Sequence, residues 1–243
     1  MRKIDSTWIL SPSDLSEFLA CEHLTNSRVA AVNRERNELP KNEGGHTKIV
    51  KRRGEEHEIE QIRLLEEQLG TTAFDLKPRE GQWPSSIEEM RLAASKTLTA
   101  MKEGHRLITQ AVIFDEEEPW FGSGDADDDS GDVTDGDAHR FGLVDVLRRV
   151  ENCKSDLGNF AYEVVEIKLA RQIKPKFVHQ VEIYSRALAK MQGFSPGKAW
   201  LRLGDEVEHP VHLPRYRAVG LRQEGRLRRF VEDPPRILSL IHI

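Results

Sequence analysis

Apolar residues recur at helical spacing through the first hundred residues of the chain. Ser11-Pro12-Ser13-Asp14 is typical of a helix start, and predicts a helix that runs toward Cys21. Apolar positions three and four apart predict a second helix from about Lys51 to Gly70, and capping residues predict a third from Ser85 or Ser86 to about Glu103. The polar, glycine-containing stretch 33–53 is expected to be a connection.

The pattern changes after Gly104 to short runs rich in β-branched residues. The expected elements, in order, are strands at 107–114, 140–150 and 162–169, a helix at 174–191, a hairpin of 199–203 with 207–213, and a basic helix at 215–231. Helices, strands, a helix, a hairpin and a helix predict an α/β protein in which a mixed sheet is flanked by helices.

Composition narrows the class of protein. No run of about 18 apolar residues is present and the N-terminus lacks the apolar core of a signal peptide, so we expect a cytoplasmic protein with no membrane partner. The two cysteines, Cys21 and Cys153, exclude a disulfide scaffold and a self-contained four-cysteine metal site.

The net charge of −5 is unevenly distributed along the chain. Residues 115–137 hold 11 acidic residues and no Lys or Arg, which leaves 36 basic and 30 acidic residues elsewhere. A nucleic-acid partner is therefore compatible with the rest of the chain. A calcium loop beginning at Asp125 would need Gly at 130 and Glu at 136, where the chain has Ser and Gly, so we expect a disordered insertion instead.

Two acidic residues and a lysine lie on neighbouring predicted strands. Residues two apart on a strand point to the same face, so Glu166 and Lys168 are expected to project together while Val165 and Ile167 pack the other way. If the strand that holds Asp145 pairs with this one, two carboxylates and an ammonium group meet at the sheet surface. Metal-assisted hydrolysis of a phosphodiester needs such groups, because carboxylate oxygens bind Mg²⁺ or Mn²⁺.

Residues on two helices could extend this group. Gln180 and Tyr184 are four apart on the helix after the Glu166 strand, so they share a face that can return to the site. His57 lies in the first turns of an earlier helix, but Glu58 shares a face with the apolar residues of that helix and is an alternative inward acid. The structural alternatives are a surface position for His57 and a core aromatic for Tyr184.

Taken together, Gly54-x-x-His57, Gly142-x-x-Asp145, Glu166-x-Lys168 and Gln180-x-x-x-Tyr184 resemble the motifs of the RecB-like branch of the PD-(D/E)xK nuclease superfamily. The chain is similar to bacterial RecB-like nucleases often joined to a superfamily-one helicase, and to exonucleases of CRISPR adaptation. The resemblance covers residues 8–232 and implies one domain with a restriction-endonuclease-like core and an N-terminal helical portion. Its expected parts are a helical region at 8–104, the catalytic sheet and helix at 105–213 and the basic helix at 214–232, with 115–137 as an acidic insertion.

The resemblance also implies roles for individual residues. Asp145 and Glu166 would ligate Mg²⁺ or Mn²⁺ with the backbone carbonyl of Ile167, and Lys168 would act in water activation or transition-state stabilisation. His57 would be an additional metal ligand, with Glu58 as its alternative. Gln180 and Tyr184 would position Lys168 and the nucleic-acid backbone.

The expected function is metal-dependent hydrolysis of DNA, on single strands or ends, during repair, recombination or foreign-DNA processing. Arg171, Lys174 and Lys176 follow the Glu166 strand and are candidates for contacts with phosphates. The chain has no Walker A pattern, so a superfamily-one helicase is expected in cis or in trans. The alternative is a catalytically inactive nucleic-acid-binding module that serves such a helicase.

Cys21 has two interpretations. In relatives of this branch, a cysteine at the end of the first helix joins three later cysteines on an iron–sulfur cluster, and Cys21 occupies that first position. No cysteine follows Cys153, which is expected in a loop before the Glu166 strand, so this chain alone cannot complete a cluster. The ending 233–243 is expected to be a truncated tail that stops before the missing cysteines. The alternative is that Cys21 is a small buried core residue.

Overall fold

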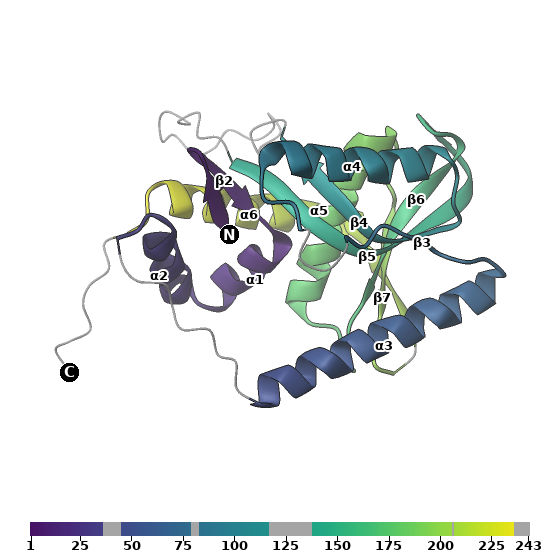
Figure 1. Ribbon diagram of the computed structural model, residues 1–243, viewed down its shortest axis with the longest axis horizontal. Coiled ribbons are helices and arrows are strands. Elements are labelled where there is room, and N and C mark those ends of the chain that lie inside the picture. The colour runs from purple at the N-terminus through teal and green to yellow at the C-terminus, as the bar shows by residue number, and fades with distance from the viewer. Residues whose placement is uncertain (36–44, 79–82, 117–137, 206, 236–243) are drawn as a thin grey trace.

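The computed structural model describes residues 1–35, 45–78, 83–116, 138–205 and 207–235. The strands are β1 (Arg2–Ile4), β2 (Thr7–Leu10), β3 (Phe74–Asp75), β4 (Leu107–Asp115), β5 (Ala138–Ser155), β6 (Gly158–Ile167), β7 (Lys198–Arg202) and β8 (Glu208–His212). The helices are α1 (Pro12–Ala20), α2 (Glu22–Val32), α3 (Gly45–Leu69), α4 (Ile87–Lys102), α5 (Pro175–Gln192) and α6 (Arg217–Glu232), with a 3₁₀ turn at Leu213–Arg215. The predicted α/β class with a mixed sheet flanked by helices is confirmed (Figure 1).

The sheet is organised around β5, which is its longest described strand. Along one edge, β4 pairs with residues 140–148 in antiparallel register. Along the other edge, β2 pairs in parallel with 138–140, and β6 pairs in antiparallel register from Val146 onward. Residues 141–145 therefore have no strand partner on this second edge within the described part of the chain. Gly142 and Asp145 lie in that gap.

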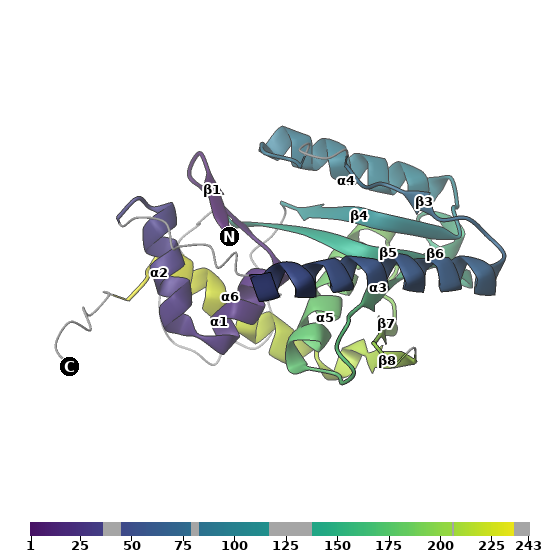
Figure 2. The same ribbon diagram turned by 60° about the horizontal axis from the view of Figure 1, so that its bottom comes forward.

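Helices cover the sheet on both of its faces. The larger core joins α4 and α5 to residues such as Val144 and Val164, while Leu65 of α3 packs with Val146 and Val165 on another part of the sheet. In both views α4 runs alongside β4, and in Figure 2 α3 crosses in front of the strands (Figures 1 and 2). On α5, four residues spaced three or four apart are buried: Phe177, Val181, Tyr184 and Leu188.

The two ends of the described chain pack together beside the sheet. Trp8, Phe18 and Val29 from the N-terminal elements share a core with Leu227 and Val231 of α6. Figures 1 and 2 show α1, α2 and α6 gathered at one end of the molecule. The sequence analysis predicted α1 and α6 but not β1, β2 or α2, because these strands are short and the apolar residues of α2 do not follow one face.

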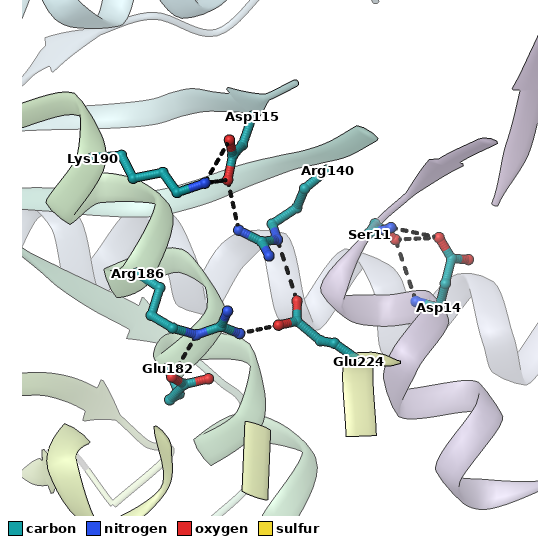
Figure 3. Close-up of polar contacts among 8 residues, drawn as sticks. All are labelled: Ser11, Asp14, Asp115, Arg140, Glu182, Arg186, Lys190 and Glu224. Atoms are coloured by element: carbon teal, nitrogen blue, oxygen red, sulfur yellow. Dashed lines mark hydrogen bonds and ion pairs between the residues drawn. The ribbon is translucent and has the colours of Figure 1, made fainter. Parts of the chain in front are cut away.

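A chain of ion pairs fixes α6 against the sheet and α5 (Figure 3). Arg140 on β5 pairs with Asp115 at 2.9 Å and with Glu224 of α6 at 3.2 Å, and Glu224 also pairs with Arg186 of α5. Arg186 reaches Glu182 at 2.7 Å on its own helix. Lys190 of α5 also pairs with Asp115, at 3.0 Å, and is partly exposed. The other groups are almost fully buried, and their charges are compensated within the protein.

Three sequence expectations are corrected by the fold. Helix α3 begins at Gly45, inside the stretch 33–53 that was expected to be a connection. Strand β5 extends to Ser155, so Cys153 lies on a strand rather than in a loop. Strand β6 ends at Ile167, and Lys168 follows it instead of lying within it. The calcium loop alternative, most of the acidic insertion and the end of the tail lie outside the described residues.

None of the described helices is long and apolar enough to cross a membrane.

Candidate functional site

The side chains of Asp145, Glu166 and Lys168 meet where β6 ends beside the gap on β5. The Asp145 carboxylate accepts a 2.8 Å hydrogen bond from the backbone N–H of Ile167, and lies 3.4 Å from the ammonium nitrogen of Lys168. The same nitrogen donates to the Glu166 carboxylate. The Asp145 backbone N–H points at the other oxygen of Glu166, at 3.4 Å. One ammonium group thus bridges two carboxylates from adjacent strands.

Burial makes these charges unusual. Glu166 is 0% exposed, and burial followed by repulsion from Asp145 raises the pKa of its carboxyl to about 8, although Lys168 opposes the shift. Burial alone would lower the pKa of Lys168, but the charges of Glu166 and Asp145 outweigh it and the net pKa is raised. Lys168 therefore stays protonated. Additional positive charge beside Glu166 would lower the pKa of its buried carboxyl.

Helix α3 brings Glu58 toward this group. Burial and then the charge of Asp145 raise the pKa of Glu58, while a hydrogen bond from the side chain of Gln110 and the charges of Lys168 and Lys77 lower it. Gln110 donates to the Glu58 carboxylate from β4. His57 is half-buried on the same helix, and its Nε2 is buried without a hydrogen-bond partner among the described residues. Both residues border the inward face of α3, and among the described residues only Glu58 has a contact that connects it to the group.

Gln110 is a site residue that the sequence analysis missed. The register pairs Thr109 with Val146 and Ala111 with Val144, which leaves Gln110 opposite Asp145. Its backbone has φ +53°, a left-handed conformation that is uncommon for residues other than glycine. Neither its residue type nor the apolar pattern of the strand signals this conformation.

Gln180 and Tyr184 reach the gap on β5 from α5. The Tyr184 hydroxyl is hydrogen bonded to the Gln180 side chain and to the backbone of Leu143. A Cβ built on Gly142 would lie 2.4 Å from Cε1 of Tyr184, so the tyrosine ring occupies the space that a side chain there would need. The described contacts thus connect the pair to the backbone just before Asp145, rather than to Lys168.

The candidate phosphate contacts lie beside the site. Arg171, Lys174 and Lys176 are exposed on the segment that leads from Lys168 into the first turn of α5. By contrast, some arginines of the basic helix serve internal contacts. Arg226 pairs with Glu22, and Arg228 is buried beside Glu232.

Cys21 lies between α1 and α2 and is exposed, so the alternative of a buried core cysteine is wrong. Its sulfur accepts a hydrogen bond of 3.4 Å from the backbone N–H of Leu24 at the start of α2. Cys153 is a second free cysteine and its sulfur contacts the backbone of Glu151.

In the part of the chain that the structure describes, no three His, Cys, Asp or Glu side chains gather closely enough to hold a metal ion by themselves. The donors present are two hard carboxylates held next to each other against their mutual repulsion. Their oxygens already share one cation, the Lys168 ammonium. Carboxylate oxygens are the type of ligand that a divalent cation such as Mg²⁺ prefers. Further ligands would have to come from the main chain or from helix α3.

Comparisons with known proteins give no family. No protein-family model matches the chain, and no curated protein matches it. The crystal structure of SSO0001 aligns with 97% of this chain and 81% of that chain, at 16% identity and a TM-score of 0.37. A likeness this weak supports no conclusion about fold family or activity.

Proposed function

We propose that this chain is a metal-dependent nuclease that hydrolyses DNA phosphodiester bonds, with a restriction-endonuclease-like core of the RecB type. The observation that carries the proposal is the meeting of Asp145, Glu166 and Lys168 at the end of β6. Two carboxylates and a lysine from adjacent strands are the groups that this chemistry uses. The resemblance of their spacing to the nuclease motifs adds support from the sequence.

Asp145, Glu166 and the backbone carbonyl of Ile167 would hold Mg²⁺ or Mn²⁺, with Glu58 as the next ligand and His57 as its alternative. The ion, when bound, polarises a phosphoryl oxygen and lowers the pKa of a bound water. The closeness of the two carboxylates supports this assignment, because a cation between them offsets their mutual repulsion, as the Lys168 ammonium already does. An iron–sulfur cluster at Cys21 has no further support, since the chain holds two cysteines and such a cluster is held by four.

Lys168 would act on the scissile phosphate. Its side chain is 20% exposed and its ammonium group remains protonated, so it presents a fixed positive charge beside the carboxylates. A fixed charge at this place stabilises the negative charge that builds up on the phosphate oxygens during attack by water. Gln180 and Tyr184 keep the Asp145 segment in place through Leu143 and Gly142.

The proposed substrate is single-stranded DNA or DNA ends, held through Arg171, Lys174 and Lys176 next to the site. Such contacts with phosphates give binding that depends on salt and not on sequence. Hydrolysis of DNA ends or single strands fits a role in repair, recombination or foreign-DNA processing in the cytoplasm. A superfamily-one helicase would unwind the duplex.

The test is cleavage of end-labelled single-stranded DNA by the purified chain with Mn²⁺ or Mg²⁺. We expect Asp145→Asn, Glu166→Gln and Lys168→Met each to reduce cleavage by at least about 100-fold. Asp5→Asn is the matched control, because Asp5 lies exposed in the β1–β2 turn at φ +47°, which Asn tolerates. Binding without cleavage in the parent protein would identify the inactive helicase-serving module instead. Cleavage that survives Asp145→Asn and Lys168→Met would place the chemistry elsewhere.

A further inference from the structure

A groove of about 710 Å³ lies between α4 and the segment that follows β3. This volume is within the range of about 300–1,000 Å³ found for pockets that hold small ligands. The residues that decide its chemistry are Lys77, Pro78, Trp83, Glu89, Leu92 and Lys96. None of them belongs to the candidate site described above.

The groove exposes large apolar side chains. Trp83 is 46% exposed and Leu92 is 59% exposed, although tryptophan in particular usually buries most of its ring. Prolines 78 and 84 and Ala93 extend the same apolar surface. An exposed tryptophan in a hollow lined by small and rigid residues can receive another flat ring on its face.

Positive charge borders this apolar surface. Lys77 and Lys96 are both exposed, and neither makes an ion pair among the described residues. The acid on the lining, Glu89, is engaged by Ser85, whose backbone N–H and hydroxyl donate to its carboxylate at 2.7 and 2.8 Å. The groove therefore offers two available cations beside an aromatic ring.

Part of the groove lining lies near the candidate site. Leu76 donates a backbone hydrogen bond to Thr109 at 3.0 Å, which places Lys77 beside the part of β4 that holds Gln110. Lys77 acts electrostatically on Glu58, the residue that Gln110 holds toward Asp145. Val112, two residues beyond Gln110, lies in the groove wall. A ligand in the groove would thus reach the neighbourhood of Asp145.

We propose that this groove holds single-stranded nucleic acid beside the site, with a base stacked on Trp83 and phosphates paired with Lys77 and Lys96. The inference rests on the proposed nuclease function, since it names the binding surface for the same substrate. Alternating bases and phosphates match an apolar floor with cations on its border, and aromatic side chains stack on bases irrespective of sequence. Paired bases of a duplex are already stacked and cannot present their faces to Trp83.

The test measures binding of fluorescein-labelled oligothymidylate by anisotropy in EDTA, so that no cleavage occurs. Trp83→Ala should weaken binding about 5- to 100-fold, while Trp83→Phe, which keeps a ring, retains most of the affinity. An abasic oligonucleotide of the same length should bind the parent and Trp83→Ala equally. Replacing both Lys77 and Lys96 with Ala should weaken binding of both oligonucleotides and reduce the slope of log K against log salt by about 1.4.

Lys102→Ala is the matched control, because Lys102 is exposed on the same helix as Lys96 and outside the groove. The proposal is overturned if the groove variants bind like Lys102→Ala, if duplex DNA depends on Trp83 equally, or if the parent binds no oligothymidylate at low salt. The last outcome would favour an apolar peptide as the occupant.

Cleavage assays on the same variants separate this proposal from the one on function. If cleavage requires Asp145 but binding ignores Trp83 and the two lysines, the groove assignment fails and the nuclease proposal stands. If binding depends on the groove but the parent cleaves nothing with Mn²⁺, the nuclease proposal fails and the groove remains a nucleic-acid site.

Discussion

The ring of Tyr184 fills the space above Gly142. A Cβ at position 142 would lie 2.4 Å from Cε1 and 3.0 Å from the hydroxyl oxygen of Tyr184. The same hydroxyl is hydrogen bonded to Leu143. The tyrosine therefore fixes the part of β5 just before Asp145, where the strand has no partner on its second edge. This contact gives a physical reason why Gly142 and Tyr184 occur together.

Gly142→Ala is expected to destabilise the protein by about 1–3 kcal/mol through overpacking, and to reduce DNA cleavage by displacing Asp145. Tyr184→Ala removes the clash but leaves a cavity. The double variant should therefore be more stable than the sum of the two single effects predicts, which urea unfolding measures. Additive effects would show that the two residues do not constrain each other.

Glu58 and His57 are the two candidates on α3 for a ligand of the proposed metal ion. We expect Glu58→Gln to increase the Mn²⁺ concentration for half-maximal cleavage by about tenfold or more, because Glu58 acts on Asp145 and Lys168. His57→Gln should have the smaller effect. A larger effect for His57→Gln would assign its unpartnered Nε2 to the metal instead.

Arg202 connects α3 to the sheet beside the site. Its guanidinium donates to Gln61 at 3.0 Å and to Glu208 at 3.1 Å, and its backbone oxygen accepts from the N–H of Lys168. Arg202→Met should cost about 3 kcal/mol of stability, because it leaves buried polar groups unpaired. Hydrogen exchange should increase in α3 more than in α5. Arg63→Met on the outer face of α3 is the control, and it should change stability little because the ion pairs of Arg63 are exposed to solvent.

Substitution by alanine at two helical glycines should change the stability of the protein in opposite directions. A Cβ on Gly220 of α6 would lie 2.2 Å from a carboxylate oxygen of buried Glu182, whereas a Cβ on Gly54 of α3 meets nothing within 4 Å. Gly220→Ala should destabilise by about 1–3 kcal/mol, and Gly54→Ala should stabilise by about 0.5–1 kcal/mol. Thermal unfolding of both variants checks this pair, and the same sign for both would refute it.

His179 on α5 should make stability depend on pH. Burial lowers the pKa of its imidazole, and the charge of Glu224 opposes the shift only in part. The folded protein therefore binds fewer protons than the unfolded chain, so stability falls as pH falls through the unfolded pKa of about 6.5. Urea unfolding at pH values on both sides of about 6.5 should show a smaller loss for His179→Gln. An equal loss in parent and variant would contradict this assignment.

Structural features that depend on a few neighbouring residues were predicted correctly from the sequence. Ser11 and Asp14 form the expected capping box, with the Ser11 backbone N–H donating to the Asp14 carboxylate at 2.8 Å, and Ser86 caps α4 through Glu89. The buried residues of α5 lie three and four positions apart, as expected for a helix with one buried face. Capping and periodicity involve residues within one or two turns, so the sequence alone contains them.

Contacts between segments far apart in the sequence could be identified only in the tertiary structure. The sequence determined that Glu166 and Lys168 lie two apart at one predicted strand and that Gly142 and Asp145 lie three apart on another. Only the fold decided that the gap between β2 and β6 leaves Asp145 free to accept from Ile167, that Gln110 turns Glu58 toward it, and that α6 pairs with α5 through Glu224. These arrangements depend on how well surfaces far apart in the chain fit each other, which no local pattern records.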